Sequence, residues 1–450
     1  MISRRELLSL APAAAVAQTS AAARRPNIVV ILMDDLGCHD LGAWGGADLK
    51  TPHIDSLAAS GVRFTNWYAA APVCSPSRAG LLTGRHPIRA GVPNNGPPLA
   101  PSERTIASLV KPAGYATAIV GKWHLGSTPE TVPNAHGFDR FFGFHSGCID
   151  FYSHRYYWGE PRTVNYHDLW RDRTEVFEDG QYSTELFTRE AVRFIRENRA
   201  RPFFLYLAYN AVHYPMHAPR QYVERFAGLD PERRTYAAML AAADDGVGQV
   251  MSAVREAGLR DNTLVFFTAD NGATREARAG LDQKPATAGK NSPFRGNKFS
   301  AFDGGMHVPM IMSCPGAIPS GRVVAQVGSH LDILPTACAA AGVTVPGDRT
   351  MDGFDALPMA KGAESRHDAI YWSIGGQLAV RRGKWKLVQN GKTYDGTPEG
   401  NQPLTGDDAV FLSNLEQDPG ESRNLRHEQA AVADELLTLA RAWEKSVTEK

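Results

Sequence analysis

A cysteine stands beside a predicted helix start in the stretch "PVCSPSRAGLLTGR". Ser75 is a good N-cap, Pro76 suits the first helical position, and Gly84 stands where a helix C-cap would fall. Cys74 is therefore expected directly before a helix N-terminus, where free N–H groups and the helix dipole attract anions. Arg78 would add positive charge within the first turn. A lone cysteine is usually a small buried hydrophobe, but this setting predicts a reactive group aimed at an anion.

Acidic and amide side chains follow two apolar runs. The run "NIVVILMDD" stops at Asp34 and Asp35, and "NTLVFFTADNG" stops at Asp270 and Asn271. Three carboxylates on one rim would repel one another unless a cation neutralised them. Their oxygen ligands suit Ca²⁺, and less well Mg²⁺, rather than zinc. The structural alternatives are strand-end capping by the aspartates and a simple Asn-Gly turn.

Basic side chains follow two other apolar runs. The run "YATAIVGKWH" stops at Lys122 and His124, "PFFLYLAYNAVH" stops at His213, and Lys298 follows later in "FRGNKFSAFDGG". Together these side chains could surround an anion beside the cation. A lone histidine is more often structural and a lysine is usually solvated, and for Lys298 alone that interpretation is favoured. The rigid backbone at Pro215 favours a fixed position for His213.

Short apolar runs alternate with helical patterns through most of the chain. This alternation is typical of a mostly parallel sheet that helices cover on both faces. In open sheets of this kind, ligands bind at the carboxyl ends of the strands. Because each of the four runs stops at polar residues, we expect these residues to converge on one site.

The chain carrying these motifs resembles the sulfatases. The stretch "CSPSR" followed by "LTG" is similar to the sulfatase signature. In that family a formylglycine-generating enzyme oxidises the cysteine of the signature, here Cys74, to formylglycine. The similarity runs from Pro26 to about Leu425 and includes "DDLG", "TPHIDSLAASGVRFTNWY", "GKWHLG", "HGFDRFFGF", "ADNG" and "RGNKFSAFDGGMHVP". Within the family the chain looks most like the arylsulfatase A and B type, including galactosamine-sulfate sulfatases. The resemblance implies an α/β, alkaline phosphatase-like fold, with a large mixed, mostly parallel sheet between helices and a small C-terminal antiparallel sheet plus helix.

The resemblance also implies a sulfuric ester hydrolase that acts on an aryl or carbohydrate sulfate, with a galactosamine-type sugar as one candidate. In the family, the aldehyde at the position of Cys74 hydrates to a geminal diol. One hydroxyl, held on the metal, attacks sulfur and expels the alcohol or phenol. The second hydroxyl then loses its proton, and collapse of the diol releases sulfate. A thiol has no second hydroxyl and therefore cannot release the sulfate in this way.

Site roles follow from the resemblance position by position. The family's Ca²⁺ ligands, together with the diol at residue 74, match Asp34, Asp35, Asp270 and Asn271. Arg78 would hold the formylglycine, and Lys122 would help to hold it and the sulfate. His124 matches the base that triggers collapse of the diol. His213 and Lys298 match the pair that grips sulfate and protonates the leaving oxygen, a role that a raised His213 pKa would favour.

The segment "DGGMH" departs from the family pattern. Asp303 stands where the family has glutamate, and His307 stands where it has arginine. The two glycines, Gly304 and Gly305, are present, and we expect a plain turn that preserves the local fold. The departure puts in doubt any substrate contact of the missing arginine.

The whole chain has 450 residues and no net charge, with 48 basic and 48 acidic side chains. This balance argues against nucleic acid or an anionic membrane as a bulk partner. The start "MISRRELL" resembles a twin-arginine export signal, so residues 1–23 are predicted to be a signal and the protein periplasmic or secreted. An uncleaved disordered tail is the alternative. No apolar run is long enough to span a bilayer of about 30 Å.

We expect a catalytic domain over residues 24–355 and an antiparallel subdomain over residues 356–450. In the latter, "AIYWSIGGQLAVRRGKWKLVQNG" predicts strands around a Gly-Gly turn and a second pair around Asn390-Gly391, and "FLSN" predicts a further strand. Residues 428–447 read as an amphipathic helix. The basic run at 381–384 is interpreted as a solvated hairpin.

Two further groups of side chains allow more than one interpretation. Tyr156, Tyr157 and Trp158 lie in a predicted rim loop and could stack on a sugar or pack beneath the loop. The cysteines show no metal-type spacing, and the four other than Cys74 could form two disulfides; Cys314 and Cys338 are more typical of core positions. The four cysteines other than Cys74 are Cys38, Cys148, Cys314 and Cys338.

Two other functions remain open at the level of sequence. A phosphonate or phosphate monoester hydrolase of the same superfamily would share the fold and the modified cysteine. A non-catalytic protein that binds sulfated glycans would be expected to lack part of the constellation, and none of the matched positions is missing.

Overall fold

The computed structural model describes residues 25–157, 165–282 and 284–449. The predicted export signal and Trp158 lie outside these ranges. Within them, no helix is both long and apolar enough to cross a membrane. All five cysteines are buried and free, so none of the four candidates for disulfide bonds is paired.

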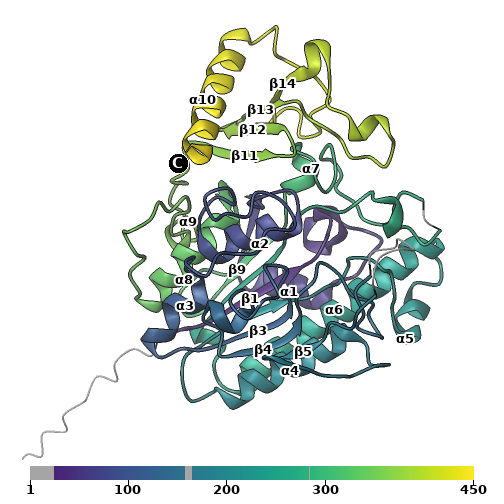
Figure 1. Ribbon diagram of the computed structural model, residues 1–450, viewed down its shortest axis with the longest axis vertical. Helices are drawn as coiled ribbons and strands as arrows, with labels where there is room; N and C mark the ends of the chain where they lie inside the picture. Colours follow the sequence, from purple (N-terminus) through teal and green to yellow (C-terminus); the bar gives the residue numbers. More distant parts are fainter. Residues whose placement is uncertain (1–24, 158–164, 283, 450) are drawn as a thin grey trace, which may run out of the picture.

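Ten strands of the described residues form one large mixed sheet in the order β10-β2-β9-β8-β1-β7-β3-β4-β5-β6 (Figure 1). The central run from β8 to β4 is parallel, as is the β10–β2 pair, whereas the other neighbours are antiparallel. The predicted mixed, mostly parallel sheet is confirmed. The strands are β1 (Asn27–Met33), β2 (Val62–Tyr68), β3 (Ala116–Lys122), β4 (Arg140–Phe144), β5 (Trp170–Arg171), β6 (Thr174–Glu175), β7 (Phe203–Ala208), β8 (Thr263–Ala269), β9 (Met310–Ser313) and β10 (Arg322–Ser329).

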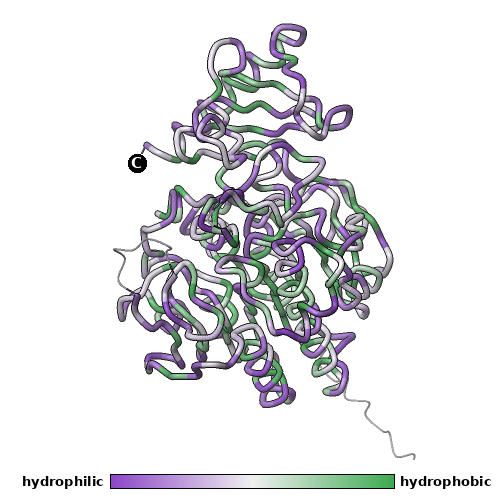
Figure 2. The backbone as a smooth tube through the Cα atoms, turned by 90° about the vertical axis from the view of Figure 1, so that its right-hand side faces the viewer, coloured by the Kyte–Doolittle hydropathy of each residue, from purple (hydrophilic) through white to green (hydrophobic). Residues whose placement is uncertain are grey.

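The central strands are covered on both faces. Every residue of β1, β3, β7 and β8 is buried, and Figure 2 shows hydrophobic segments concentrated inside the larger part of the molecule. A strand buried on both faces needs apolar side chains at successive positions rather than at alternate ones. This requirement explains the continuous apolar runs of the sequence and why polar residues stand out at their ends.

Two groups of helices pack around the large sheet (Figure 1). The first contains α1, α4 and α5, which contact the long helix α6, and the second contains α2 and α3, which contact α8. These helices are α1 (Pro52–Ala59), α2 (Cys74–Thr83), α3 (Ile106–Val110), α4 (Ser183–Glu197), α5 (Arg220–Val223), α6 (Pro231–Glu256) and α8 (Ile333–Ala341). Two shorter helices, α7 (Asp303–Met306) and α9 (Leu357–Ala360), lie later in the chain.

A small antiparallel sheet forms the top of the molecule in Figure 1. Its strands are β11 (Ile370–Ile374), β12 (Gln377–Arg382), β13 (Trp385–Gln389) and β14 (Val410–Asn414), and α10 (Ala430–Thr448) packs on it. The predicted Gly-Gly turn, the strand at "FLSN" and the terminal helix are confirmed. The predicted domain boundary near residue 355 stays a prediction: α9, after it, contacts β10 of the large sheet.

The second predicted hairpin is wrong. The chain turns at Gly383-Lys384, which joins β12 to β13, and β13 pairs next with β14, far along the chain from Asn390-Gly391. Gly383 has φ of 56°, which a two-residue hairpin loop of this kind requires. The Asn-Gly signal is locally strong, but pairing with the distant β14 decides where β13 finds its partner.

Candidate active site

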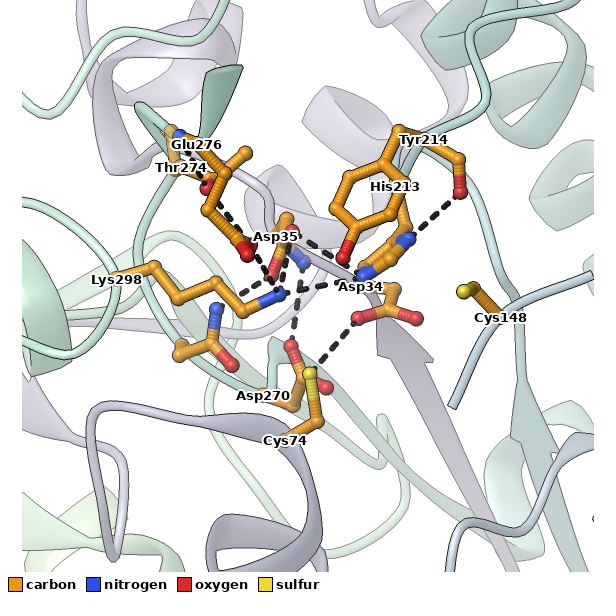
Figure 3. A network of polar contacts seen from close by, with 12 residues as sticks. Asp34, Asp35, Cys74, Cys148, His213, Tyr214, Asp270, Thr274, Glu276 and Lys298 are labelled. Atoms are coloured by element: carbon orange, nitrogen blue, oxygen red, sulfur yellow. Dashed lines mark hydrogen bonds and ion pairs between the residues drawn. The ribbon is translucent and has the colours of Figure 1, made fainter. Parts of the chain in front are cut away.

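Four adjacent parallel strands, β8, β1, β7 and β3, bring polar side chains to one edge of the large sheet. The convergence predicted from the strand ends is present, and all of these side chains are at least largely buried. Figure 3 shows the carboxylates, the Cys74 thiol and the Lys298 ammonium pointing toward one another. The strand ends supply Asp34, Asp35, Lys122, His124, His213, Asp270 and Asn271.

Helix α2 begins two residues earlier than the sequence indicates. Cys74 is its first residue, and the extended Val73 is its N-cap, without a side-chain hydrogen bond. Ser75 is not the cap, because its hydroxyl donates instead to the carbonyl of His124. Arg78 is therefore the fifth helical residue and lies beyond the first turn. The predicted C-cap is confirmed: Gly84 has φ of 66°, and its N–H donates to the Gly80 carbonyl.

The Cys74 thiol faces a carboxylate inside the protein. Its Sγ lies 3.6 Å from Asp34 Oδ1, and only 1% of the residue is exposed. Burial raises the pKa of the Cys74 thiol well above its usual range, although Lys122 and Lys298 oppose the shift. Since the thiolate is the nucleophilic form of cysteine, the unmodified side chain is a poor nucleophile here.

Carboxylates crowd together beside the thiol. The backbone N–H of Asp35 donates to Asp270 Oδ1 at 3.2 Å, and Asn271 Nδ2 donates to Asp35 Oδ1 at 2.7 Å. Burial raises the pKa of Asp35 to about 7, and the charges of Asp34 and Asp270 add to this shift against the effect of Lys298. Asn271 Oδ1 is buried without a hydrogen-bond partner among the described residues. An unpaired amide oxygen beside crowded carboxylates fits a hard cation.

Two buried cations, Arg78 and Lys122, contact this acidic cluster. Arg78 donates through Nε and Nη2 to Asp270 Oδ2 at 3.0 and 2.7 Å, and through Nη1 to the Lys122 carbonyl at 3.1 Å. Lys122 Nζ lies 2.7 Å from Asp34 Oδ2. Burial would lower the pKa of Lys122, but the adjacent Asp34 carboxylate outweighs it and raises the pKa. These contacts fix the carboxylates in place and keep both cations charged.

A second cluster surrounds the Lys298 ammonium (Figure 3). Its Nζ lies 2.9 Å from Asp35 Oδ2, 3.2 Å from His213 Nε2 and 3.5 Å from Glu276 Oε2. His213 Nδ1 lies 2.7 Å from the Tyr214 carbonyl, which can only accept a hydrogen bond. Nδ1–H is therefore the donor there, and Nε2 is the acceptor toward Lys298. Burial and the nearby Lys298 hold the pKa of His213 well below its usual value. A raised His213 pKa would favour its proposed role as a proton donor, whereas these surroundings lower it.

His124 lies at the other side of the α2 start. It adopts φ of 58°, and its backbone N–H donates to the His145 carbonyl at 3.2 Å. Its Nδ1 is buried without a hydrogen-bond partner among the described residues. Burial and the Lys122 charge hold the pKa of His124 well below its usual value. The ring is therefore neutral and able to accept a proton.

Glu276 and Gln377 are two residues at this site that the sequence did not indicate. Glu276 lies on the loop after β8 and contacts Lys298. Gln377 begins β12 in the small sheet, and its Oε1 accepts from the backbone N–H groups of Ala301 and Lys392, each at 3.0 Å. No local motif marks either residue, because their contacts depend on how distant segments meet.

Asp303 and His307, the two departures from the family pattern, make structural contacts. Asp303 accepts hydrogen bonds from the Tyr68 hydroxyl at 2.8 Å and from Lys386 Nζ at 2.6 Å. His307 Nε2 lies 2.8 Å from the Thr65 carbonyl. The two glycines form part of the one-turn helix α7 rather than a plain turn, and a Cβ on Gly304 would collide with the Gly296 carbonyl.

The basic run of the small sheet is only partly solvated. Arg381 is buried, and it bonds to the Tyr68 hydroxyl and, at 3.2 Å, to Asn66 Oδ1. The interpretation of this run as a solvated hairpin is therefore wrong for Arg381. Its guanidinium instead joins the small sheet to β2 of the large one.

The predicted rim aromatics pack against other aromatic rings. Tyr156 stacks on Tyr166 with ring centroids 5.1 Å apart, and Tyr157 lies edge-on to Tyr214 at 6.3 Å. Both tyrosines are only partly buried and pack against a small cluster that contains Cys148. These contacts favour the packing interpretation for the two described tyrosines.

Comparisons with known proteins point to one family. The family model described as Sulfatase matches residues 26–343. The chain is 39% identical to N-acetylgalactosamine-6-sulfatase of Mus musculus, over 80% of this chain and 71% of that protein. It is 34% identical to arylsulfatase A of Bos taurus, over 96% and 89%. The crystal structure of Ps i-CgsB in complex with k-i-k-neocarrahexaose superimposes with a TM-score of 0.82 at 32% identity, covering 93% of each chain.

Proposed function

The chain belongs to the sulfatase family and hydrolyses sulfuric esters, and we propose that its substrate is a sulfated carbohydrate attacked by a formylglycine made from Cys74. The observation that carries the proposal is the position of Cys74, buried at the first turn of α2 and 3.6 Å from the Asp34 carboxylate. The names of the relatives support a carbohydrate, with galactosamine-type sulfates as the first class to test.

The acidic cluster is proposed to hold Ca²⁺. The unpaired Asn271 Oδ1 and the raised pKa of Asp35 are the features that a divalent cation would relieve. A bound cation would act as a Lewis acid toward the reacting oxygen. The residues that would hold it are Asp34, Asp35, Asp270, Asn271 and the modified residue 74.

Conversion of Cys74 supplies what its thiol lacks. Because burial keeps the thiol protonated, the unmodified residue could attack sulfur only poorly. A formylglycine would supply an oxygen nucleophile and a route for its regeneration. The maturation partner would be a formylglycine-generating enzyme, and we propose a periplasmic or secreted location for the mature protein.

The surrounding side chains are proposed to bind the sulfate and move protons. Lys122, which contacts Asp34, and Lys298, which contacts Asp35, would grip the anion, while Arg78 fixes Asp270. Burial alone would lower the pKa of Lys298, but Asp35 helps to raise it well above its usual range. The leaving oxygen would receive its proton from the Lys298–His213 pair. The neutral His124 would accept a proton in the second half of the reaction.

Mass spectrometry of the tryptic fragment 64–78 tests this proposal. Protein from a host that makes formylglycine should show a fragment lighter by about 18 Da than one with cysteine, as thiol-to-aldehyde conversion requires, and Cys74→Ala protein should be inactive. Unmodified Cys74 in fully active protein would overturn the proposed nucleophile. Faster hydrolysis of a phosphate ester than of the sulfate ester of the same phenol would favour a phosphatase, and binding of a sulfated sugar without turnover by formylglycine-bearing protein would favour a glycan-binding role.

A further inference from the structure

Glu276 places a carboxylate beside the cation that is proposed to grip the substrate anion. Its Oε2 lies 3.5 Å from Lys298 Nζ (Figure 3). Its Oε1 lies 2.5 Å from Arg278 Nη2, and the Thr274 hydroxyl donates to Oε2 at 3.2 Å. Burial would raise the pKa of Glu276, but Lys298 and Arg278 outweigh it and lower the pKa. The carboxylate is therefore held in place and charged.

This carboxylate is not needed for the proposed cation site. Glu276 is not one of the residues grouped closely enough to share a metal ion with Asp34 and Asp35, and Asp35 Oδ2 already contacts the ammonium at 2.9 Å. A negative group next to an anion-binding lysine weakens the attraction for every anion. A site selected only for tight anion binding would have no use for it, so its presence calls for a different role.

The Glu276 side chain also faces an open pocket. The pocket has a volume of about 640 Å³, and Lys298 and Glu276 lie on its wall together with Arg278, Phe299 and Tyr394. Tyr394 packs near Phe299 with ring centroids 5.5 Å apart. An ester in this pocket would bring its anionic group near both Glu276 and Lys298, because both side chains line it.

We propose that Glu276 is a specificity-determining residue that disfavours dianionic phosphate monoesters relative to monoanionic sulfate esters. The inference rests on the proposed function, because it takes Lys298 as a sulfate-binding group. Coulomb repulsion from a fixed carboxylate grows in proportion to the charge of the ligand. A phosphate monoester carries nearly two negative charges above its second pKa of about 6, whereas a sulfate monoester carries one. The same carboxylate thus penalises the phosphate ester about twice as strongly in free energy.

Three esters of one phenol separate charge from the identity of the central atom. A sulfate monoester and a phosphonate monoester each carry one negative charge, and a phosphate monoester carries nearly two at about pH 8. In Glu276→Gln, the ratio of kcat/KM for the phosphate to that for the sulfate should rise roughly tenfold or more. The ratio for the phosphonate to the sulfate should stay unchanged, because both lose the same repulsion.

Matched variants isolate the charge. Glu276→Asp keeps the carboxylate and should retain most of the discrimination of the wild type. Glu256→Gln removes the same charge from an exposed ion pair with Arg196 on α6 and should leave all ratios unchanged. Arg278→Gln removes the cation that partly offsets Glu276 and should move the phosphate-to-sulfate ratio down. A ratio is insensitive to a loss of folded protein, since it affects every substrate equally.

A second readout does not depend on turnover. Thermal unfolding of each folded variant with added sulfate or phosphate ester measures binding through the shift in Tm, and phosphate ester should stabilise Glu276→Gln more than it stabilises the wild type. Unchanged ratios and unchanged Tm shifts in a variant that still cleaves sulfate esters would overturn this inference and leave the proposed function intact. A wild-type protein that fails to cleave any sulfate ester would overturn the proposed function instead.

Discussion

The side-chain amide of Gln377 donates a 2.8 Å hydrogen bond to the backbone carbonyl of Phe299, the residue after Lys298. Phe299 adopts φ of 75°, an unfavourable conformation for a residue with a side chain. Its own N–H donates to the Pro72 carbonyl at 2.7 Å, two residues before Cys74. The small sheet therefore holds the Lys298 segment against the start of α2 and takes part in building the site.

Replacement of Gln377 by alanine should impair the reaction through Lys298. The change removes the bond to Phe299 and leaves the N–H groups of Ala301 and Lys392 without their acceptor. We expect kcat to fall roughly tenfold to hundredfold, because small displacements of a catalytic group are costly. Steady-state kinetics with phenyl sulfates of differing leaving-group pKa would measure the fall in kcat. If Lys298 and His213 supply the proton, kcat should fall most for the esters with the poorest leaving groups.

A control distinguishes this effect from general destabilisation. Gln389→Ala lies on the neighbouring strand β13 at a partly exposed position and should not alter kcat. If Gln377→Ala lowered only Tm and left kcat and its leaving-group dependence unchanged, Gln377 would be a structural residue and not a positioning one.

Much of the site could be predicted because its residues end buried parallel strands. Apolar runs that stop at Asp34, Lys122, His213 and Asp270 are visible in the sequence, and parallel packing makes their ends meet. Lys298 is different: it follows no strand, and its place in the site depends on hydrogen bonds to the small sheet. From the residues alone, Lys298 is interpreted as a solvated side chain, and its specific role comes from the resemblance.

Other features depended on contacts that no local pattern encodes. The observed start of α2 differs from the predicted one because the Ser75 hydroxyl donates to the His124 carbonyl and does not cap the helix. Glu276 and Gln377 went unnoticed because each acts on Lys298 or its neighbour from another part of the chain. In the sequence Arg381 is part of an ordinary basic run, and its contact with β2 is visible only in the folded structure.

Removal of divalent cations should destabilise the protein. Without a cation, the carboxylates of Asp34, Asp35 and Asp270 repel one another, and Asn271 Oδ1 lacks a partner. A chelator should lower Tm by several degrees, and Ca²⁺ should restore it in proportion to the logarithm of its concentration. Differential scanning calorimetry would measure both shifts.

Two variants test whether Ca²⁺ binds at this acidic cluster. Asn271→Ala should weaken the response of Tm to Ca²⁺. Asp245→Asn alters the other acidic group, formed with His53 and Asp244, and should leave the response unchanged. A Ca²⁺ response that is lost in Asp245→Asn and retained in Asn271→Ala would place the cation elsewhere.

Replacement of Lys386 by methionine should destabilise the contact between the two sheets. Lys386 Nζ is buried, 2.6 Å from Asp303 Oδ1 and 3.2 Å from Glu421 Oε1. Loss of the cation leaves two buried carboxyl groups without their charge partner, which typically costs about 3–5 kcal/mol of unfolding free energy. Urea unfolding would measure the loss, and burial, which raises the pKa of Glu421 to about 7, should make the loss smaller at mildly acid pH.

An exposed pair provides the comparison for Lys386. Arg196→Met breaks a surface ion pair with Glu256, in which both side chains are more than 60% exposed, and should change the unfolding free energy little. Equal losses for Lys386→Met and Arg196→Met would contradict the assigned role of the buried network.

Acid should destabilise the fold through buried neutral histidines. Burial lowers the pKa of His86 and His330 to about 3 and that of His136 and His307 to about 4. Below the unfolded value of about 6.5, the unfolded chain binds protons that the folded chain does not bind. Stability should therefore be independent of these groups above about pH 7, and each should remove about 1.4 kcal/mol per pH unit between pH 6.5 and its folded pKa.

His330 tests this dependence directly. Its ring lies between the hydroxyls of Ser77 and Thr268, at 3.2 and 3.1 Å, where a glutamine amide could also form hydrogen bonds. The unfolding free energy of His330→Gln should fall less between pH 7 and pH 5.5 than that of the wild type, by about 1 kcal/mol. His53→Gln changes a half-exposed ring on α1 and should leave the slope as it is. A wild-type slope in His330→Gln would mean that His330 takes up its proton in the folded protein as readily as in the unfolded chain.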